Sequence, residues 1–202
     1  MLFFKKAVVS ALALLAAPSI AALTPAQMVG NIEMLTTKSK ALQNPANSIT
    51  LVNGPLIVIG LGPFPQIIAG FTEIVTITST AITQMQGSAV ITNPTDAKAI
   101  ADAFRKFVEV HQVLLNILIG KAGLFNTVPI IGTPVAAVLR SLEAVVDTVA
   151  LRIIDTVEVA IHKSTIQSNA NSLSGTITVS INAYQGLSLK KRHTRDFTMI
   201  DA

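Results

Sequence analysis

The sequence predicts an all-α protein, a four- to five-helix bundle of long amphipathic helices around an apolar interior cavity. Of its 202 residues, 50% are hydrophobic, 13% are charged and only 4% are aromatic. Apolar residues recur at helical spacing over several long stretches, and Pro or Gly marks the joints between them. No convincing pair of strands is evident, so the helices are expected to bury their apolar faces against one another.

The chain opens with a predicted secretory signal peptide over residues 1–21. Lys5 and Lys6 form its basic start, an eleven-residue apolar run follows, and small residues stand at the −3 and −1 positions of a cleavage site after Ala21. The apolar run is too short to span a bilayer. We therefore expect a secreted protein, extracellular or in a cell wall, with no transmembrane anchor.

The net charge of +4 lies at the two ends of the chain. Between residues 22 and 189, nine Lys or Arg balance nine Asp or Glu, so the body offers no basic surface and no nucleic-acid partner is expected. The complete absence of cysteine excludes disulfide frameworks and cysteine-ligated zinc. We expect one helical domain over 22–187 and a basic flexible tail over 188–202.

The first helix is predicted over 25–43. Thr24 serves as its N-cap, Pro25 takes the first helical position, and Gln27 completes a capping box. Apolar residues then follow at helical spacing until an Asn-Pro pair stops them.

Residues 54–72 carry no charge, and their nineteen-residue length meets that of a membrane span. Their density of Gly and Pro opposes one continuous helix, so we expect an apolar connection that leads into a second helix near Phe64. That helix ends at Gly87. Its many β-branched residues keep a strand over 73–83 as the alternative.

The third helix, predicted over 96–119, has the clearest pattern. Its apolar face repeats from Ile100 to Leu118 and includes His111. Opposite charges spaced four residues apart lie on the other side, where each pair contributes only ~0.3–0.5 kcal/mol. The position of His111 fits a satisfied core histidine, a polar group inside a ligand cavity, or a catalytic residue.

The fourth helix is expected to begin at Thr133 and Pro134, which repeat the N-cap and first-turn proline. Its apolar stripe runs for about seven turns to Ala160. The last segment, 169–186, fits a strand or a helix equally well. We choose a helix, because no partner strand is evident.

Catalytic and metal-binding motifs are missing from the sequence. The two histidines of the body, His111 and His162, do not have zinc-binding spacing. Neither a nucleophile elbow nor a phosphate-binding loop occurs. We therefore expect a protein that is not an enzyme and needs no metal or cofactor. With no Trp and one Tyr, the sequence also disfavours aromatic stacking on sugars.

Four segments of the second half form a recognisable pattern: 102–115 (DAFRKFVEVHQVLL), 118–124 (LIGKAGL), 134–143 (PVAAVLRSLE) and 146–147 (VD). This pattern resembles the fungal hydrophobic surface-binding protein A family, which is similar to the lipid-binding domains of cell-wall galactomannoproteins. The resemblance covers about Leu23 to Tyr184 and is strongest over 100–160. It implies a secreted fungal protein, not an enzyme, whose helical bundle binds hydrophobic surfaces and, in relatives, fatty acids in an interior cavity.

A bundle of this size can enclose an extended acyl chain, because a helix of about twenty residues is ~30 Å long. Burial contributes ~0.8 kcal/mol for each methylene, whereas one polar contact adds only ~1–3 kcal/mol. The predicted lipid-binding wall consists of Phe71, Ile74, Phe104, Phe107, Leu114, Leu139, Leu142 and Val146. The predicted head-group partners are Thr78, Ser79 and His111. Each of these residues also fits a filled, dry core.

The partner expected from these patterns is a fatty acid or another hydrophobic ligand or surface, with the cell-wall polysaccharide matrix as a further partner. Two alternatives stay open. One is a structural, O-glycosylated cell-wall protein without a specific ligand, and the other is a membrane-active secreted effector that inserts 54–72. The sequence does not decide between binding in a cavity and adsorption to a surface.

Overall fold

The computed structural model describes the backbone of residues 22–125 and 129–197, and the side chains of 22–124 and 131–185. The described chain is helical, as predicted. β structure within it is limited to an isolated bridge between Ile91 and Val157. The elements are α1 (Pro25–Ala41), α2 (Gln43–Asn47), the 3-10 helix η1 (Gly54–Ile59), α3 (Pro63–Gln84), α4 (Pro94–Ala122), the 3-10 helix η2 (Gly123–Phe125), α5 (Pro129–Thr156) and α6 (Ala160–Phe197).

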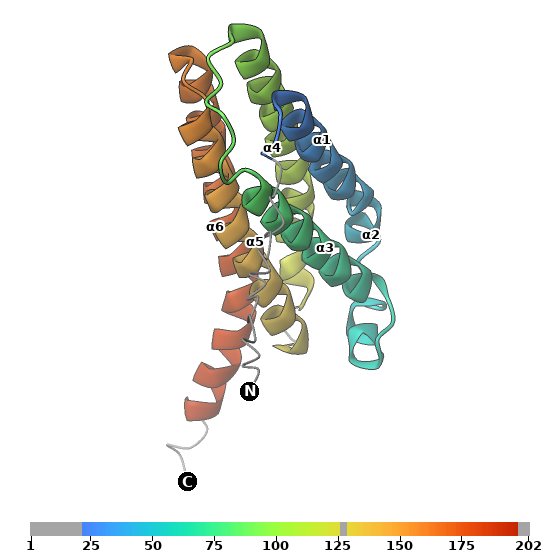
Figure 1. Cartoon of the computed structure of the whole chain (residues 1–202). Coiled ribbons are helices and arrows are strands. Elements are labelled where there is room, and N and C mark those ends of the chain that lie inside the picture. The colour runs from blue at the N-terminus through green and yellow to red at the C-terminus, as the bar shows by residue number, and fades with distance from the viewer. Residues whose placement is uncertain (1–21, 126–128, 198–202) are drawn as a thin grey trace, which may run out of the picture.

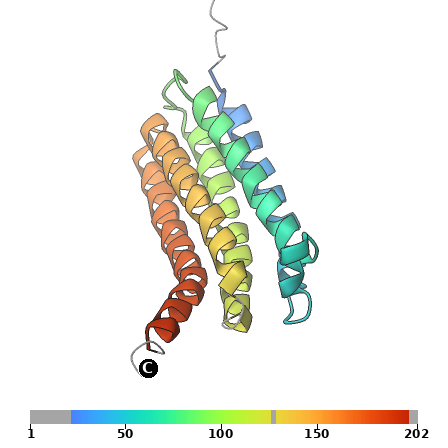
Figure 2. The ribbon, with the colours of Figure 1, turned by 90° about the horizontal axis from the view of Figure 1, so that it is seen from below.

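The five long helices lie side by side with roughly aligned axes (Figures 1 and 2), and the contacts between them close into a ring. α1 packs on α4, α4 on α6, α6 on α5, α5 on α3, and α3 closes the ring against α1. α4 and α5 follow each other in the chain, yet each packs against α6, which lies between them in the ring of contacts. The all-α bundle is therefore confirmed, and the apolar faces of all five helices turn toward a common interior.

Hydrogen bonds between helices show how they are oriented. The side chain of Gln112 in α4 donates to the hydroxyl of Thr176 in α6. Further along both helices, the hydroxyl of Tyr184 donates to the carbonyl of Leu118. Because residue numbers increase in the same direction along both helices, α4 and α6 are parallel. α5, which lies between them in chain order, runs in the opposite direction. The ring is thus not a simple up-and-down arrangement of sequential neighbours.

The predicted start of the first helix is confirmed, and α4 begins at Pro94, two residues before the predicted start of the third helix. Thr24 accepts from the backbone N–H of Gln27, and the Gln27 side chain accepts from the N–H of Thr24, which completes the capping box. Asn93 caps α4 by accepting from the N–H of Thr95. α4 then runs three residues beyond the predicted 119, since Gly120 does not end it.

α3 is a continuous helix, so the strand alternative over 73–83 is wrong. Ile67, Phe71 and Ile74 are buried along one face. On the exposed face, a row of hydroxyl groups donates to the carbonyls four residues earlier, which satisfies these polar groups within the helix; the row comprises Thr72, Thr76, Ser79, Thr80 and Thr83.

The fourth predicted helix differs from α5 at both ends. α5 begins at Pro129 rather than at Thr133, because Ile131 already belongs to its buried stripe. Pro134 therefore lies inside the helix, in its second turn. The predicted stripe to Ala160 is also interrupted, since α5 ends at Thr156.

The interruption between α5 and α6 has a visible cause. The N–H of Ile91, in the connection before α4, donates to the carbonyl of Thr156, and the N–H of Glu158 donates to the carbonyl of Ile91. These bonds replace helical ones, so α6 starts afresh at Ala160.

α6 confirms the choice of helix for 169–186, and its backbone stays helical to Phe197, inside the range 188–202 predicted as a tail. The predicted signal peptide over 1–21 lies outside the described residues. Within 22–125 and 129–197, none of the helices has both the length and the apolar character that a membrane span requires.

Candidate functional site

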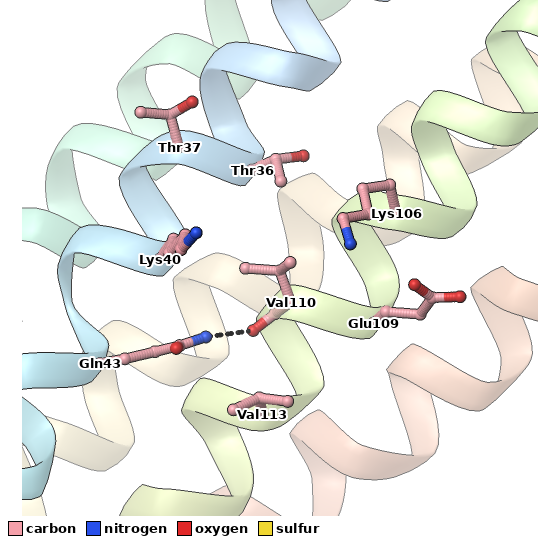
Figure 3. A pocket seen from close by; sticks show the side chains of 8 residues that line it. All are labelled: Thr36, Thr37, Lys40, Gln43, Lys106, Glu109, Val110 and Val113. Carbon is pink, nitrogen blue, oxygen red and sulfur yellow. Dashed lines mark hydrogen bonds between the residues drawn. The ribbon is translucent and has the colours of Figure 1, made fainter.

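One hollow opens on the outside of the ring, between α1 and α4, with a volume of about 630 Å³. Figure 3 shows its lining: Thr36, Thr37, Lys40, Gln43, Lys106, Glu109, Val110 and Val113. The Gln43 amide donates across it to the carbonyl of Val110 at 3.1 Å. Three further hollows lie between surface segments. None of the predicted lipid-binding residues lines any of these four hollows.

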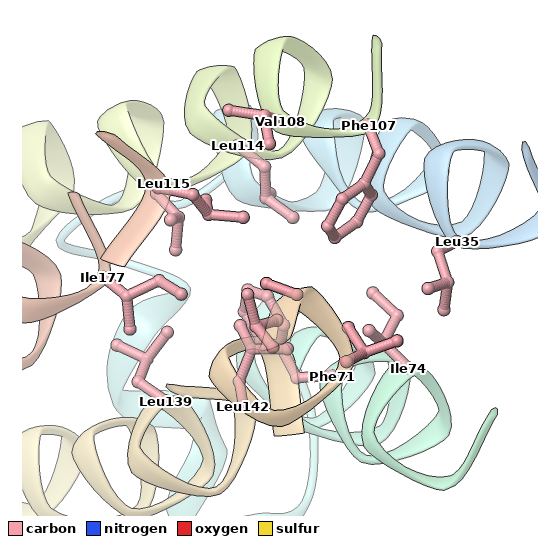
Figure 4. Packing of buried hydrophobic residues seen from close by; sticks show 14 of the residues in the cluster. Leu35, Phe71, Ile74, Phe107, Val108, Leu114, Leu115, Leu139, Leu142 and Ile177 are labelled. Atoms are coloured by element: carbon pink, nitrogen blue, oxygen red, sulfur yellow. The ribbon is translucent and has the colours of Figure 1, made fainter. Parts of the chain in front are cut away.

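The eight predicted wall residues lie inside the ring instead, and each is at most 1% exposed. They come from α3, α4 and α5. In Figure 4, Phe107 and Leu114 of α4 face Phe71 of α3 and Leu139 and Leu142 of α5 across the interior. The structure therefore brings the predicted wall together in a single apolar cluster.

α1 and α6 also contribute to this cluster, although the predicted wall contains no residue from either helix. Leu35 of α1 and Ile177 of α6 are buried beside the predicted residues. Leu35 belongs to the periodic stripe of the first helix, and Ile177 to that of 169–186. Both stripes were visible in the sequence, but which helices adjoin the same interior is decided by the ring.

The three predicted head-group partners have different surroundings. Thr78 is buried, but its hydroxyl donates to the Ile74 carbonyl of its own helix at 2.7 Å. Ser79 lies on the exposed face of α3 and donates to the Val75 carbonyl at 2.8 Å. Successive helical residues are rotated by about 100°, so these two neighbours face opposite environments. Ser79 is thus separated from the other ten predicted residues.

His111 of α4 is fully buried at the centre of the aromatic side chains. Its ring centroid lies 5.9 Å from that of Phe71 in an edge-on arrangement and 5.2 Å from that of Phe107. Nδ1 lies 2.7 Å from Oγ of Ser39 in α1. Nε2 has no hydrogen-bond partner in the described part of the chain. Burial lowers the pKa of His111 from 6.5 to about 4, so the imidazole is neutral at pH 7.

Ser39, Ser180 and Tyr184 are buried polar residues that the sequence analysis did not single out as site residues. Ser39 stands four residues after Leu35 in the apolar stripe of α1, and that spacing was the available signal. Oγ of Ser180 has no partner among the described residues. The Tyr184 hydroxyl donates to the Leu118 carbonyl at 2.9 Å, and burial raises the pKa of Tyr184.

The interior is uncharged throughout the described side chains. The buried polar residues there are Ser39, Thr78, His111, Ser180 and Tyr184, and none carries a charge at pH 7. The ion pair of Lys38 with Glu73 lies at the surface. Over the same described residues, no group of three His, Asp or Glu side chains is arranged to hold a metal ion.

A second apolar region lies outside the ring, in the segment 51–61 that contains η1; we call it the apolar loop. Its exposed side chains are Leu51, Val52, Leu56, Val58, Ile59 and Leu61, with Val52 85% exposed. In Figure 1 the loop, in cyan, projects beyond the N-terminal end of α3.

Asn53, Gly60 and the residue just after the loop, Gly62, define the shape of the apolar loop. The Asn53 amide donates to the Ser48 carbonyl at 2.8 Å and accepts from the N–H of Thr50 at 2.7 Å. Gly60 and Gly62 both have positive φ, at 75° and 82°. The loop therefore holds its apolar side chains in water with a defined backbone.

Comparison with known proteins finds similarity in structure only. No protein-family model matches the sequence, and no curated protein matches it. Among solved structures, AfMP4p in complex with palmitic acid is similar, with a TM-score of 0.69 and 14% identity over 80% of this chain and 99% of that chain. This chain has the same fold.

Two domains of the MP1 protein of Penicillium marneffei are also similar. Ligand-binding domain 1, complexed with arachidonic acids, gives a TM-score of 0.67 at 14% identity and covers 80% of this chain and 99% of that one. Ligand-binding domain 2, complexed with multiple arachidonic acids, gives 0.63 at 13% identity, with coverage of 80% and 94%. At such identities the similarity shows a shared all-α fold, and the fatty acids belong to those proteins.

Proposed function

We propose that this protein is a lipid-binding protein, not an enzyme, and that it holds a fatty acid or a similar lipid in the interior of its helical ring. The observation that carries the proposal is the character of that interior. Its described side chains are mostly apolar and none is charged, yet Nε2 of His111 and Oγ of Ser180 are buried there without partners among the described residues. Such atoms are rare in filled cores, and a ligand with a polar end would give them a partner.

The energetics favour an acyl chain as that ligand. At ~0.8 kcal/mol for each methylene, fourteen methylenes contribute on the order of 11 kcal/mol as an upper bound. A head-group contact adds ~1–3 kcal/mol. The length of the chain and the shape of the interior are therefore expected to dominate affinity, with the predicted wall residues of α3, α4 and α5 in contact with the chain. The fatty acids bound by AfMP4p and by the MP1 domains support this proposal.

A matched pair of substitutions tests where the lipid lies. Val146 is buried in the interior, and Val113 is half exposed and lines the outer hollow. We expect Val146→Phe to lower the affinity for palmitic acid about 10-fold or more, because the added ring fills space that the chain needs. Val113→Phe should leave it unchanged. Equilibrium partitioning of radiolabelled palmitic acid measures both, and mass spectrometry of an organic extract shows whether a lipid copurifies.

The opposite effect of the two substitutions would place the lipid-binding site outside the ring. If Val113→Phe abolishes binding and Val146→Phe does not, the lipid lies in the outer hollow beside Lys40 and Lys106. If the wild-type chain binds no palmitic acid and copurifies with no lipid, the structural wall-protein alternative is favoured. The exposed hydroxyl row of α3 would then offer attachment points for O-linked sugars.

We further propose that the protein is secreted and adsorbs to hydrophobic surfaces through the apolar loop. The leader sequence supports secretion, and the exposure of the loop supports adsorption. The effector alternative has less support, because 54–72 is divided between η1 and the start of α3, where Phe64 and Ile67 are buried.

Substitution within the apolar loop tests adsorption separately from lipid binding. Val58→Asp combined with Ile59→Asp should lower the adsorption constant on polystyrene about 10-fold or more, since each side chain loses a contact of ~1.5–3 kcal/mol. Thr80→Asp, on the exposed face of α3, is the control. A quartz crystal microbalance measures adsorption, and equal adsorption of all three proteins would exclude the apolar loop.

A further inference from the structure

The contacts of Ser39 decide whether Nδ1 of His111 donates or accepts a hydrogen bond. Its hydroxyl lies 2.8 Å from the Leu35 carbonyl and 2.7 Å from Nδ1 of His111. A serine hydroxyl has a single hydrogen, and a carbonyl can only accept. Ser39 therefore donates to Leu35 and accepts from His111, so the hydrogen of the neutral imidazole is on Nδ1.

The opposite tautomer is unfavourable at this site. If Ser39 donated to Nδ1, its oxygen would face the Leu35 carbonyl at 2.8 Å with no hydrogen between them. Nε2 would then carry a buried N–H without an acceptor, since it has no partner among the described residues. With the hydrogen on Nδ1, Nε2 is instead a bare acceptor with a free lone pair.

Nε2 faces the interior of the ring. The two ring nitrogens flank the same carbon and point in nearly opposite directions, so Nε2 turns away from α1 when Nδ1 contacts Ser39. Phe71 of α3 and Phe107 of α4 pack against the His111 ring, with centroids 5.9 Å and 5.2 Å from its own. None of these side chains has a hydrogen-bond donor to offer.

The apolar surroundings of His111 also decide whether a ligand group that binds to Nε2 can be charged. A buried carboxylate needs a cation or several donors, since an unpaired charge in an apolar interior is strongly disfavoured. The described interior holds no Lys or Arg, and His111 itself is neutral. A polar group at this depth is therefore expected to be uncharged and to carry a hydrogen.

We propose that His111 selects lipids by the hydrogen on their polar end: Nε2 accepts a hydrogen bond from the O–H of a long-chain alcohol or of a protonated fatty acid. This inference rests on the proposed function, because it requires a lipid in the interior. Esters of the same chain have no O–H and would leave Nε2 unpaired. The preference is thus for a hydrogen-bond donor and not for a negative charge.

Three lipids with the same sixteen-carbon chain test the proposal on the full chain: hexadecanol, palmitic acid and methyl palmitate. At about pH 5, where a carboxyl group is partly protonated and His111 is still mostly neutral, we expect the wild-type protein to bind the two O–H lipids about 10-fold more tightly than the ester, the equivalent of about 1.4 kcal/mol. In His111→Leu the preference should disappear through weaker binding of the O–H lipids. In His111→Gln, whose amide oxygen can accept, part of the preference should return.

A spectroscopic measurement on the wild-type protein keeps the test independent of variant folding. The ¹⁵N resonances of His111 should report the hydrogen on Nδ1 in the free protein. Hexadecanol should shift the Nε2 resonance, and methyl palmitate should leave it in place.

The outcomes separate this inference from the proposed function. If none of the three lipids binds, both fail. If all three bind equally and Nε2 does not shift, lipid binding stands and the role of His111 is wrong. If palmitic acid binds tightly while hexadecanol binds no better than the ester, the site recognises a carboxylate, which also overturns the inference.

Discussion

The interior of the ring and the apolar loop are both rich in aliphatic residues, yet one is closed to water and the other projects into it. Phe107 is 1% exposed in α4, whereas Val58 is 63% exposed in the apolar loop. The difference arises from the positions of the helix-breaking residues Gly and Pro. In α4 the apolar residues repeat without interruption and share one face, whereas Gly and Pro around 54–63 prevent a helix long enough to join the ring. Composition alone therefore does not decide burial.

The largest expected effect separates these two regions by stability. Phe107→Ala should destabilise the protein by about 3–5 kcal/mol, because it leaves a cavity at the centre of the apolar cluster. Val58→Ala, the control in the apolar loop, should change stability by about 0.5 kcal/mol or less. Urea unfolding measures both. A similar loss in the two variants would show that the apolar loop is packed in solution.

Acidification should weaken the interior specifically through His111. Its pKa is lowered from 6.5 to about 4 by burial, so between these values the unfolded chain takes up a proton that the folded chain does not. Stability should therefore fall as pH drops from about 6.5 to 4, by about 3 kcal/mol at about 1.4 kcal/mol for each pKa unit.

The pH effect is measured as the difference between wild type and His111→Gln, in which contributions from surface carboxylates cancel. Thermal unfolding at pH 7 and pH 4.5 gives the two stabilities. Equal pH dependence in both proteins would show that His111 is hydrated and titrates normally.

Smaller effects are expected from the glycines that shape the apolar loop. Gly62 has φ of 82°, and a Cβ there would lie 2.6 Å from the Asn53 carbonyl oxygen. Gly62→Ala should therefore cost about 1–2 kcal/mol and reduce adsorption without changing lipid affinity.

Gly120 provides the matched control for this substitution. It lies within α4 with open space around its Cβ position, so Gly120→Ala should stabilise the protein by about 0.5–1 kcal/mol. Differential scanning calorimetry measures both variants. If both substitutions changed the free energy of unfolding in the same direction, the positive φ at Gly62 would not constrain the choice of residue there.

Local features of the helices could be predicted from the sequence because they depend on neighbouring residues. The capping box of Thr24 and Gln27 is confirmed. The prediction failed where a distant segment competes for backbone bonds. Ile91 takes bonds at the end of α5, and nothing near Thr156 in the sequence indicates that break.

The candidate site shows the same division. Phe104, Leu114 and Leu142 could be predicted as interior residues from helical periodicity alone, and all three are buried. Ser79 could not be separated from Thr78 by residue type, since only the rotation of α3 within the ring distinguishes them. Whether a lipid contacts these residues stays a prediction.

The sequence by itself determined the helical class, the position of most helices and the apolar faces that they bury, because these follow from periodicity, caps and chain breakers over a few turns. Only the tertiary structure decided that α6 separates α4 from α5 in the ring, and that Ser39 of α1 meets His111 of α4. Such contacts join residues far apart in the chain. They depend on how five similar apolar faces pack together, which local sequence patterns do not specify.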